Sequence, residues 1–210
     1  MGPRQPELHV ITSGRQSLNE VLRVAEAAFL VGMDYLHIRE KQRTARECME
    51  WVEALAQVMP RERILVNDRV DVAAAAGCRG AHLAYHSLTP AEARRVLKPG
   101  QQIGRSVHSL AEAKQAAAEG ADYLLYGHIF PSASKPGLEP RGTDELRKIA
   151  AQVKIPVIGI GGITPENASH VLAAGSAGIA VLSGITAASD PQAAARGYRE
   201  ALDRWKESQR

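Results

Sequence analysis

The chain has 210 residues, of which 45% are hydrophobic and only 4% aromatic, a balance that favours one α/β domain over an aromatic-anchored sandwich. The net charge of +3 suits an anionic ligand, but basic and acidic residues are mixed throughout, which argues against nucleic acid as a partner. No stretch approaches the roughly 20 apolar residues of a membrane span, so we expect a cytoplasmic protein without a membrane partner.

Short runs rich in valine, isoleucine and leucine recur along the chain, each followed by an amphipathic stretch. We expect strands at Leu8–Thr12, Tyr35–Glu40, Ile64–Asp68, Ala81–Ala84, Ile103–Val107, Tyr123–Ile129, Pro156–Gly161 and Gly178–Ser183. This alternation is typical of a parallel sheet. Eight units can close into a (β/α)8 barrel, whereas an open doubly wound sheet more often stops at about five or six strands. Periodicity alone does not exclude the open sheet.

We therefore predict a single TIM barrel over residues 1–210, with frayed tails at 1–6 and 207–210. Four pairs have capping-box spacing at predicted helix starts: Ser17 with Glu20, Thr44 with Glu47, Thr89 with Glu92, and Ser109 with Glu112. Three prolines take predicted first-turn positions: Pro90, Pro165 and Pro191. The last helix is expected from Pro191 to Lys206. The two cysteines, Cys48 and Cys78, show no metal-ligand spacing and suggest no disulfide framework.

The predicted strands end in polar residues to an unusual degree, at the edge where a barrel carries its active site. The candidates for substrate binding there are Arg39, Glu40, Lys41, Asn67, Ser106 and, in a loop, Lys135. On strand two, a period of two places His37 and Arg39 on one face and Glu40 on the other. Arg39 could instead pair with Asp68 and merely plug the end of the barrel. The number of polar strand ends favours a ligand.

A glycine-rich turn joins predicted strand seven directly to a helix, in the sequence Gly159 to Pro165. Glycines allow backbone amides to approach an anion closely, and a helix N-terminus favours negative charge. Strand eight ends beside this turn with a hydroxyl and another glycine. Loops after strands seven and eight commonly bind phosphate in barrels, so we expect a phosphate site at Gly161, Gly162, Ser183 and Gly184.

His128, at the end of predicted strand six, is the candidate general acid/base, because an imidazole can take and return a proton near neutral pH. A hydrogen-bonded structural histidine is an equally good interpretation from position alone. His82 and His108 are weaker candidates, since the first lies on a short apolar strand and the second adjoins a helix cap.

At these motifs the chain resembles the thiamine phosphate synthase superfamily, and more closely its TenI branch, the thiazole tautomerases. The shared signature is HIREK, VNDRVD, GRSVHS, ADYLLYGHIF, KPGLEPRG, IPVIGIGGITPEN and AGIAVLSGI, and it spans nearly the whole chain. Synthases resemble the chain at Arg39, Lys41, Asn67, Asp68, Ser106 and Lys135. They typically have glutamine at the position of His37, a magnesium-binding aspartate at that of Ser87, and proline at that of His128.

These departures favour the tautomerase branch, because Asp68 without a second carboxylate is a poor site for the Mg²⁺ that a pyrophosphate leaving group needs. The resemblance then implies an isomerase of thiamine biosynthesis that aromatises a carboxythiazole phosphate, with His128 moving the protons. Arg39 and Lys135 would hold or polarise the carboxylate and ring, and Glu40 could assist. No cofactor or metal is expected, and the partner is the small phosphorylated thiazole carboxylate.

Two other functions stay open at this point. The first is thiamine phosphate synthase itself, which couples hydroxymethylpyrimidine pyrophosphate to the thiazole phosphate with Mg²⁺. The second is a barrel that binds thiazole or thiamine phosphates without catalysis, for regulation. A homodimer is plausible on general grounds, since most soluble oligomers are symmetric homo-oligomers.

Overall fold

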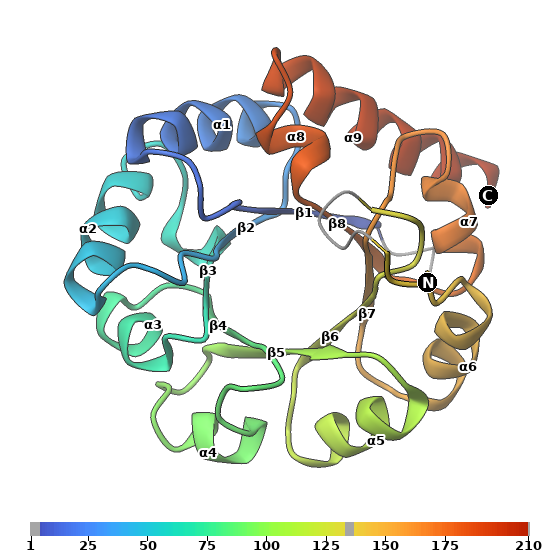
Figure 1. The fold of residues 1–210 in the computed structure, drawn as a ribbon, viewed down its shortest axis with the longest axis horizontal. Coiled ribbons are helices and arrows are strands. Elements are labelled where there is room, and N and C mark those ends of the chain that lie inside the picture. Colours follow the sequence, from blue (N-terminus) through green and yellow to red (C-terminus); the bar gives the residue numbers. More distant parts are fainter. Residues whose placement is uncertain (1–4, 133–136, 210) are drawn as a thin grey trace.

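The computed structural model describes residues 5–132 and 137–209. Eight parallel strands form a closed barrel in chain order, and the helices surround it as an outer ring (Figure 1). The strands are β1 (Glu7–Ile11), β2 (Tyr35–Ile38), β3 (Ile64–Asn67), β4 (Gly80–Leu83), β5 (Gln102–Val107), β6 (Tyr123–Gly127), β7 (Val157–Ile160) and β8 (Gly178–Val181). The predicted TIM barrel is confirmed.

The barrel closes where its first and last strands pair in parallel, with Glu7 opposite Gly178 and Val10 opposite Val181. The longer helices are α1 (Leu18–Leu30), α2 (Ala45–Leu55), α3 (Val70–Ala76), α5 (Leu110–Ala118), α6 (Asp144–Gln152) and α9 (Pro191–Ser208). Shorter ones are α4 (Pro90–Arg94), α7 (Ala168–Ala173), α8 (Ser183–Thr186) and the 3₁₀ turn η1 (Arg61–Arg63). No described helix is long and apolar enough to cross a membrane.

Most strands end one or two residues before the predicted boundary. Asp68 has φ of 62° and Gly161 has φ of 100°, so the chain leaves the sheet at these two positions. Strand β2 ends at Ile38, and Arg39 and Glu40 therefore lie in the loop. The alternation of faces that we expected for Arg39 and Glu40 does not apply, because it holds only within a strand.

The capping boxes of Ser17, Thr44 and Thr89 are all present. Ser109 also caps its helix, but the Glu112 carboxylate accepts from the backbone of His108 and not of Ser109. The prediction for Pro165 is wrong: helix α7 begins only at Ala168, because Asn167 and Thr164 close a turn before it, with a Thr164 N to Asn167 Oδ1 distance of 2.9 Å.

We predicted frayed tails at residues 1–6 and 207–210, and the structure describes only part of each tail. Helix α9 continues through Ser208, so Glu207 and Ser208 are helical. Residues 1–4 and 210 lie outside the described residues.

The main apolar core lies between the barrel and its helices, and a smaller apolar cluster fills the barrel interior. The inner cluster consists of Ile11, Leu65, Tyr123, Leu125, Ile158 and Ala180. Three histidines are also buried, His9 and His37 and His82, each at most 2% exposed. They form a polar layer in contact with the Tyr123 ring, with ring centroids 5.7 to 6.3 Å away.

Candidate functional site

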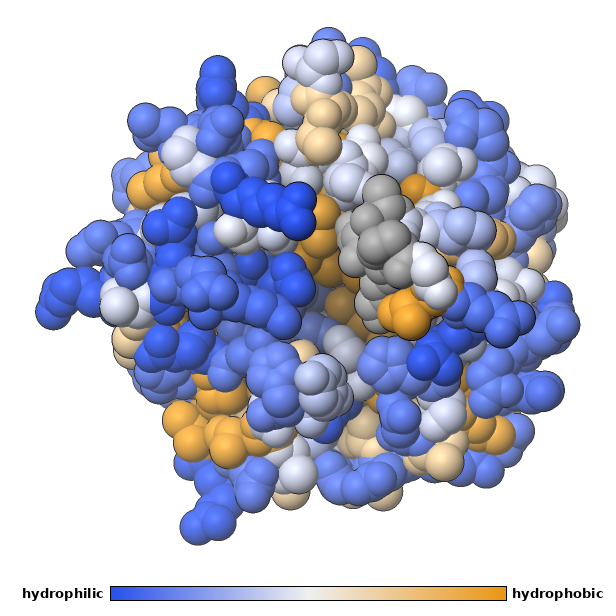
Figure 2. Space-filling model, in the orientation of Figure 1, coloured by the Kyte–Doolittle hydropathy of each residue, from blue (hydrophilic) through white to orange (hydrophobic). Residues whose placement is uncertain are grey.

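A pocket of about 190 Å³ lies beside the C-terminal ends of β2 and β3. It is lined by Arg39, Glu40, Lys41, Arg43, Asn67, Asp68, Arg69 and His86. Figure 2 shows this end of the barrel, hollowed at its centre and mainly hydrophilic on the side of α2 and α3. The structure thus brings together four of the six predicted substrate-binding residues, from two neighbouring strand ends.

The charges of the pocket are only partly neutralised from within. Arg43 Nε lies 3.3 Å from the Glu40 carboxylate, whose other oxygen accepts from the Thr12 hydroxyl at 2.7 Å. Arg69 is held by Asp71 and lowers the pKa of that carboxyl. Arg39 and Lys41 make no ion pair with any residue that the structure describes. The alternative in which Arg39 pairs with Asp68 and closes the end of the barrel is therefore not observed. Among the described residues of the pocket, these two cationic side chains remain for an anionic ligand.

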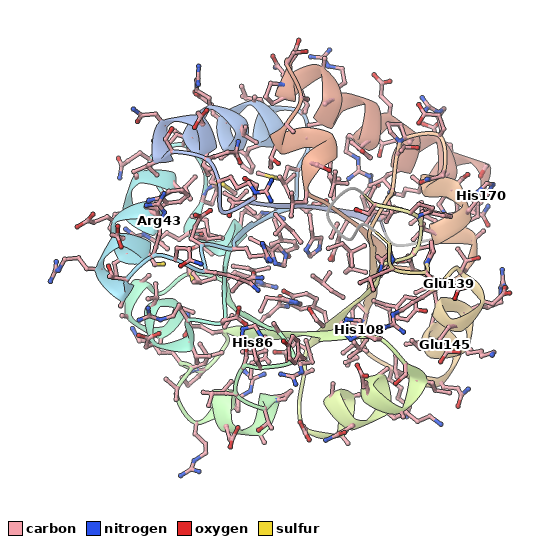
Figure 3. The ribbon with its side chains drawn as sticks, in the orientation of Figure 1. Arg43, His86, His108, Glu139, Glu145 and His170 are labelled. Atoms are coloured by element: carbon pink, nitrogen blue, oxygen red, sulfur yellow. The ribbon has the colours of Figure 1, made fainter. Side chains whose placement is uncertain are left out.

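Asp68 lines the same pocket from the turn after β3. Its Oδ1 accepts from the backbone amide of Ala84 at 3.0 Å and from the Ser87 hydroxyl. Its Oδ2 lies 3.7 Å from His86 Nε2. Figure 3 shows His86 at the inner edge of the ring near β4 and Arg43 farther out toward α2. The turn after β4 therefore delivers a hydroxyl and an imidazole to one carboxylate.

Ser106, another predicted substrate-binding residue, lies on β5 outside this pocket, where its Oγ is 2.8 Å from the buried Nε2 of His82. His37 lies deeper, with its Nε2 2.9 Å from His9 Nδ1. Burial, with His9 and His82 nearby, lowers the pKa of His37 well below its usual range. His37 is therefore neutral in the interior, and it does not face the pocket as the alternation with Arg39 suggested.

The predicted phosphate-binding residues lie on two adjacent strand ends, since β7 and β8 pair with Ile160 opposite Ala180. Gly161 and Gly162 have φ of 100° and 64°, and a side chain on Gly161 would collide with the Cβ of His128. Ser183 and Gly184 are exposed at the start of α8. The geometry is that of two loops side by side, as predicted. Lys135 lies outside the described residues.

His128 follows β6 and is buried at 6% exposure. Its Nε2 lies 3.3 Å from the carbonyl oxygen of Leu138, and its Nδ1 has no hydrogen-bond partner in the described part of the chain. The ring therefore contacts the loop between β6 and α6. It does not line the pocket of Arg39 and Asp68.

A family model described as thiamine monophosphate synthase matches residues 8–185. The chain belongs to the thiamine monophosphate synthase family. The thiamine-phosphate synthase of Chlorobium luteolum is 41% identical over 197 residues, covering 92% of each chain. That of Moorella thermoacetica is 39% identical over 198 residues, covering 93% of this chain and 94% of its own.

Solved structures agree with this assignment. Thiamine phosphate pyrophosphorylase from Pyrococcus furiosus superposes with a TM-score of 0.86 at 36% identity, covering 97% of this chain and 98% of its own. 3-Hexulose-6-phosphate synthase, at 18% identity and a TM-score of 0.75, shares the fold alone.

These relatives contradict our prediction of a thiazole tautomerase. They are named as thiamine-phosphate synthases, which are transferases, so the prediction of an isomerase is wrong as well. The prediction gave weight to single departures from the synthase pattern, at His37, Ser87 and His128. Identity of about 40% along nearly the whole chain outweighs three positions.

Sequence reasoning missed two parts of the site. Thr12 joins the loops after β1 and β2, because its Oγ1 donates to Glu40 and accepts from the backbone amide of Arg39. Tyr123 hydrogen-bonds to Nδ1 of His82, whereas Ser106 hydrogen-bonds to Nε2 of the same ring. The position of Tyr123 at the start of an apolar strand carried no signal, since aromatic residues there are usual in a core.

Proposed function

We propose that this protein is a thiamine-phosphate synthase, which joins hydroxymethylpyrimidine pyrophosphate to a thiazole phosphate in thiamine biosynthesis. The thiazole nitrogen bonds to the methylene carbon of the pyrimidine as the bond from that carbon to the pyrophosphate oxygen breaks, and pyrophosphate leaves. The observation that carries the proposal is the pocket that Arg39 and Lys41 line together with Asp68, where neither cation makes an ion pair with a described residue. The names of the relatives support it.

Arg39 and Lys41 would bind the pyrophosphate and stabilise the charge that it gains as it leaves. Arginine suits this role because its planar guanidinium donates two parallel hydrogen bonds to phosphate oxygens. Thr12 would hold the Arg39 backbone in place, since its hydroxyl oxygen accepts from the Arg39 amide at 2.9 Å. The glycine loop of Gly161 and Gly162, with Ser183 and Gly184, would bind the phosphate of the thiazole.

Magnesium commonly binds through one or two carboxylates together with phosphate oxygens of the substrate. The Asp68 carboxylate and the Ser87 hydroxyl, which lie in contact, meet this minimum. Asp68 and Ser87 would therefore hold a Mg²⁺ that neutralises charge on the pyrophosphate. The site has one carboxylate fewer than typical synthases, so we expect weaker metal binding than theirs.

The test is pyrophosphate release by the purified protein with both substrates and Mg²⁺. We expect Arg39→Gln to lower kcat/KM about 100-fold or more, the scale of one lost contact to developing charge. Asp68→Asn should raise the Mg²⁺ concentration needed for half-maximal rate. Asparagine tolerates a positive φ, so this change tests the charge and not the turn. Lys114→Gln, a charge change at an exposed position on α5, is the matched control.

Release of pyrophosphate only when both substrates and Mg²⁺ are present would support the proposal. A wild-type protein that releases no pyrophosphate, while binding thiazole phosphate by calorimetry, would refute it in favour of the non-catalytic binder. Rates in Arg39→Gln equal to those in Lys114→Gln would show that the pocket is not the site of chemistry.

A further inference from the structure

Three side chains from consecutive strands form one hydrogen-bonded line across the barrel interior. Tyr123 on β6 lies with its hydroxyl 3.2 Å from Nδ1 of His82 on β4, and His82 Nε2 lies 2.8 Å from Oγ of Ser106 on β5. His82 is 1% exposed and Tyr123 is 5% exposed, whereas Ser106 is only partly buried. The line therefore runs from the closed interior toward the open end of the barrel.

Gly104 makes this arrangement possible. It lies on β5 between the two partners, in register with His82 on one side and Tyr123 on the other. A Cβ at Gly104 would collide with the Tyr123 ring and hydroxyl and with His82 Nδ1. Ser106 is two residues farther along the same strand, so it shares the inward face and lies closer to the C-terminal end.

The protonation states decide the direction of each hydrogen bond. Burial, together with His9 and Arg105 and against the effect of Asp68, lowers the pKa of His82 to about 3. His82 is thus neutral, with one nitrogen that donates and one that accepts. Burial raises the pKa of Tyr123 well above its usual range, so the phenol keeps its proton.

The buried Tyr123 hydroxyl needs an acceptor for that proton, and His82 Nδ1 is its one hydrogen-bond partner among the described residues. Tyr123 therefore donates to Nδ1, and the proton of His82 is on Nε2. Nε2–H then donates to the Ser106 oxygen. This leaves the hydroxyl hydrogen of Ser106 free to be donated elsewhere, and the open end of the barrel is where a substrate would lie.

We infer that His82 is a positioning residue that fixes Ser106 as a hydrogen-bond donor to the bound substrate, with Tyr123 selecting the tautomer of His82. The inference rests on the proposed function for the identity of that substrate. The acceptor belongs to the pyrimidine pyrophosphate, as a ring nitrogen or a phosphate oxygen, because His82 is in register with Asn67 of the pocket and its backbone carbonyl accepts from the Asp68 amide at 2.9 Å.

Two amide variants separate positioning from packing. The Gln side chain places an amide nitrogen where His82 has Nε2, whereas Asn can reach only as far as Nδ1. We expect His82→Gln to keep kcat/KM within about threefold of wild type. His82→Asn should lower it about tenfold, the same loss as Ser106→Ala, which corresponds to one hydrogen bond. Thermal unfolding of each variant reports on folding.

The double variant His82→Asn/Ser106→Ala provides the decisive comparison. If His82 acts through Ser106, adding His82→Asn to Ser106→Ala lowers kcat/KM no further. A tenfold loss from His82→Asn in both backgrounds would overturn the inference, and so would equal losses in His82→Gln and His82→Asn.

The tautomer can be read without any activity, from long-range ¹H–¹⁵N correlation spectra of protein labelled with ¹⁵N-histidine. The His82 signals are those that disappear in His82→Gln. We expect a protonated Nε2, whose resonance shifts in Ser106→Ala, and an unprotonated Nδ1. A proton on Nδ1 would overturn the inference. Because this spectrum concerns the resting protein, absence of pyrophosphate release would count against the proposed function alone.

Discussion

Ser87 contacts Asp68 at the pocket, where typical synthases that the chain resembles have a second aspartate. A hydroxyl and a carboxylate side by side form a hydrogen bond, whereas two carboxylates repel each other unless a cation lies between them. Under the proposed function, the residue at position 87 would set how strongly this turn depends on Mg²⁺ and how stable the turn is without the ion.

We predict that Ser87→Asp binds Mg²⁺ at least about tenfold more tightly than wild type, since Mg²⁺ prefers carboxylate oxygens. The same variant should melt at a lower temperature than wild type in EDTA and recover in excess Mg²⁺, because a ligand that binds only the folded state stabilises it. Calorimetric titration with Mg²⁺ and thermal melts measure the two effects. Ser87→Asn, similar in size but uncharged, should show neither. A wild-type affinity in Ser87→Asp would show that Ser87 does not face the metal.

At the scale of elements, helix α2 begins directly after the loop that carries Arg39 and Lys41. Thr44 caps it, and the Glu47 carboxylate returns to the Thr44 amide at 2.7 Å. Arg43 lies between the cap and the site, with ion pairs to Glu40 at 3.3 Å and to Glu47 at 3.8 Å. The cap therefore orders the end of the pocket loop as well as the helix.

We predict a pH-dependent contribution from this cap. Hydrogen bonds from the Thr44 backbone and hydroxyl, with a smaller effect of Arg43, lower the pKa of Glu47. The stabilisation is then present above the unfolded pKa, about 4.3, and is lost as the pH falls through the lower folded value. Glu47→Gln should melt below wild type at pH 7 and approach it at pH 3.

Glu50→Gln is the control for that measurement, because Glu50 is exposed on the same helix and takes no part in the cap. Its melting temperature should follow wild type at both pH values. A difference between Glu47→Gln and wild type that stays constant with pH would show that the cap carboxylate does not titrate with folding.

At the scale of the whole molecule, the barrel buries two neutral histidines, His37 and His82. Burial lowers the pKa of both His37 and His82, the latter to about 3. An unfolded chain takes up a proton on each below about pH 6.5, and the folded chain does not, so acid favours unfolding. The fold that holds Ser106 in place therefore loses stability on acidification.

We predict that the free energy of unfolding falls between pH 6.5 and 5, by up to about 1.4 kcal/mol per pH unit for each buried histidine. His82→Gln should have a shallower dependence on pH, because one of these protons is no longer taken up on unfolding. His170→Gln, on the exposed surface of α7, should keep the wild-type slope. Urea titrations across this range test the prediction, which fails if His82→Gln and wild type have equal slopes.

The homodimer that we expected on general grounds stays a prediction, and light scattering of the purified protein would test it.

Much of the architecture was predictable because it depends on local patterns. The strands follow from short apolar runs, and the caps of Ser17, Thr44 and Thr89 from a spacing that any helix start obeys. The juxtaposition of Arg39, Lys41, Asn67 and Asp68 followed from barrel topology, since strand ends meet at one edge. The reaction was not predicted correctly, because the differences from synthases at single positions such as Ser87 and His128 were given more weight than the similarity of the whole chain.

The sequence by itself determined the alternation of strands and helices, the polar strand ends and the two adjacent glycine-containing loops, because each depends on residues close together in the chain. Only the tertiary structure decided which cations of the pocket make no ion pair with a described residue, that Ser87 contacts Asp68, and that His82 connects Tyr123 to Ser106 beside Gly104, which has no side chain. Those contacts join different strands across the barrel, and their distances depend on how the whole sheet closes, which no local pattern encodes.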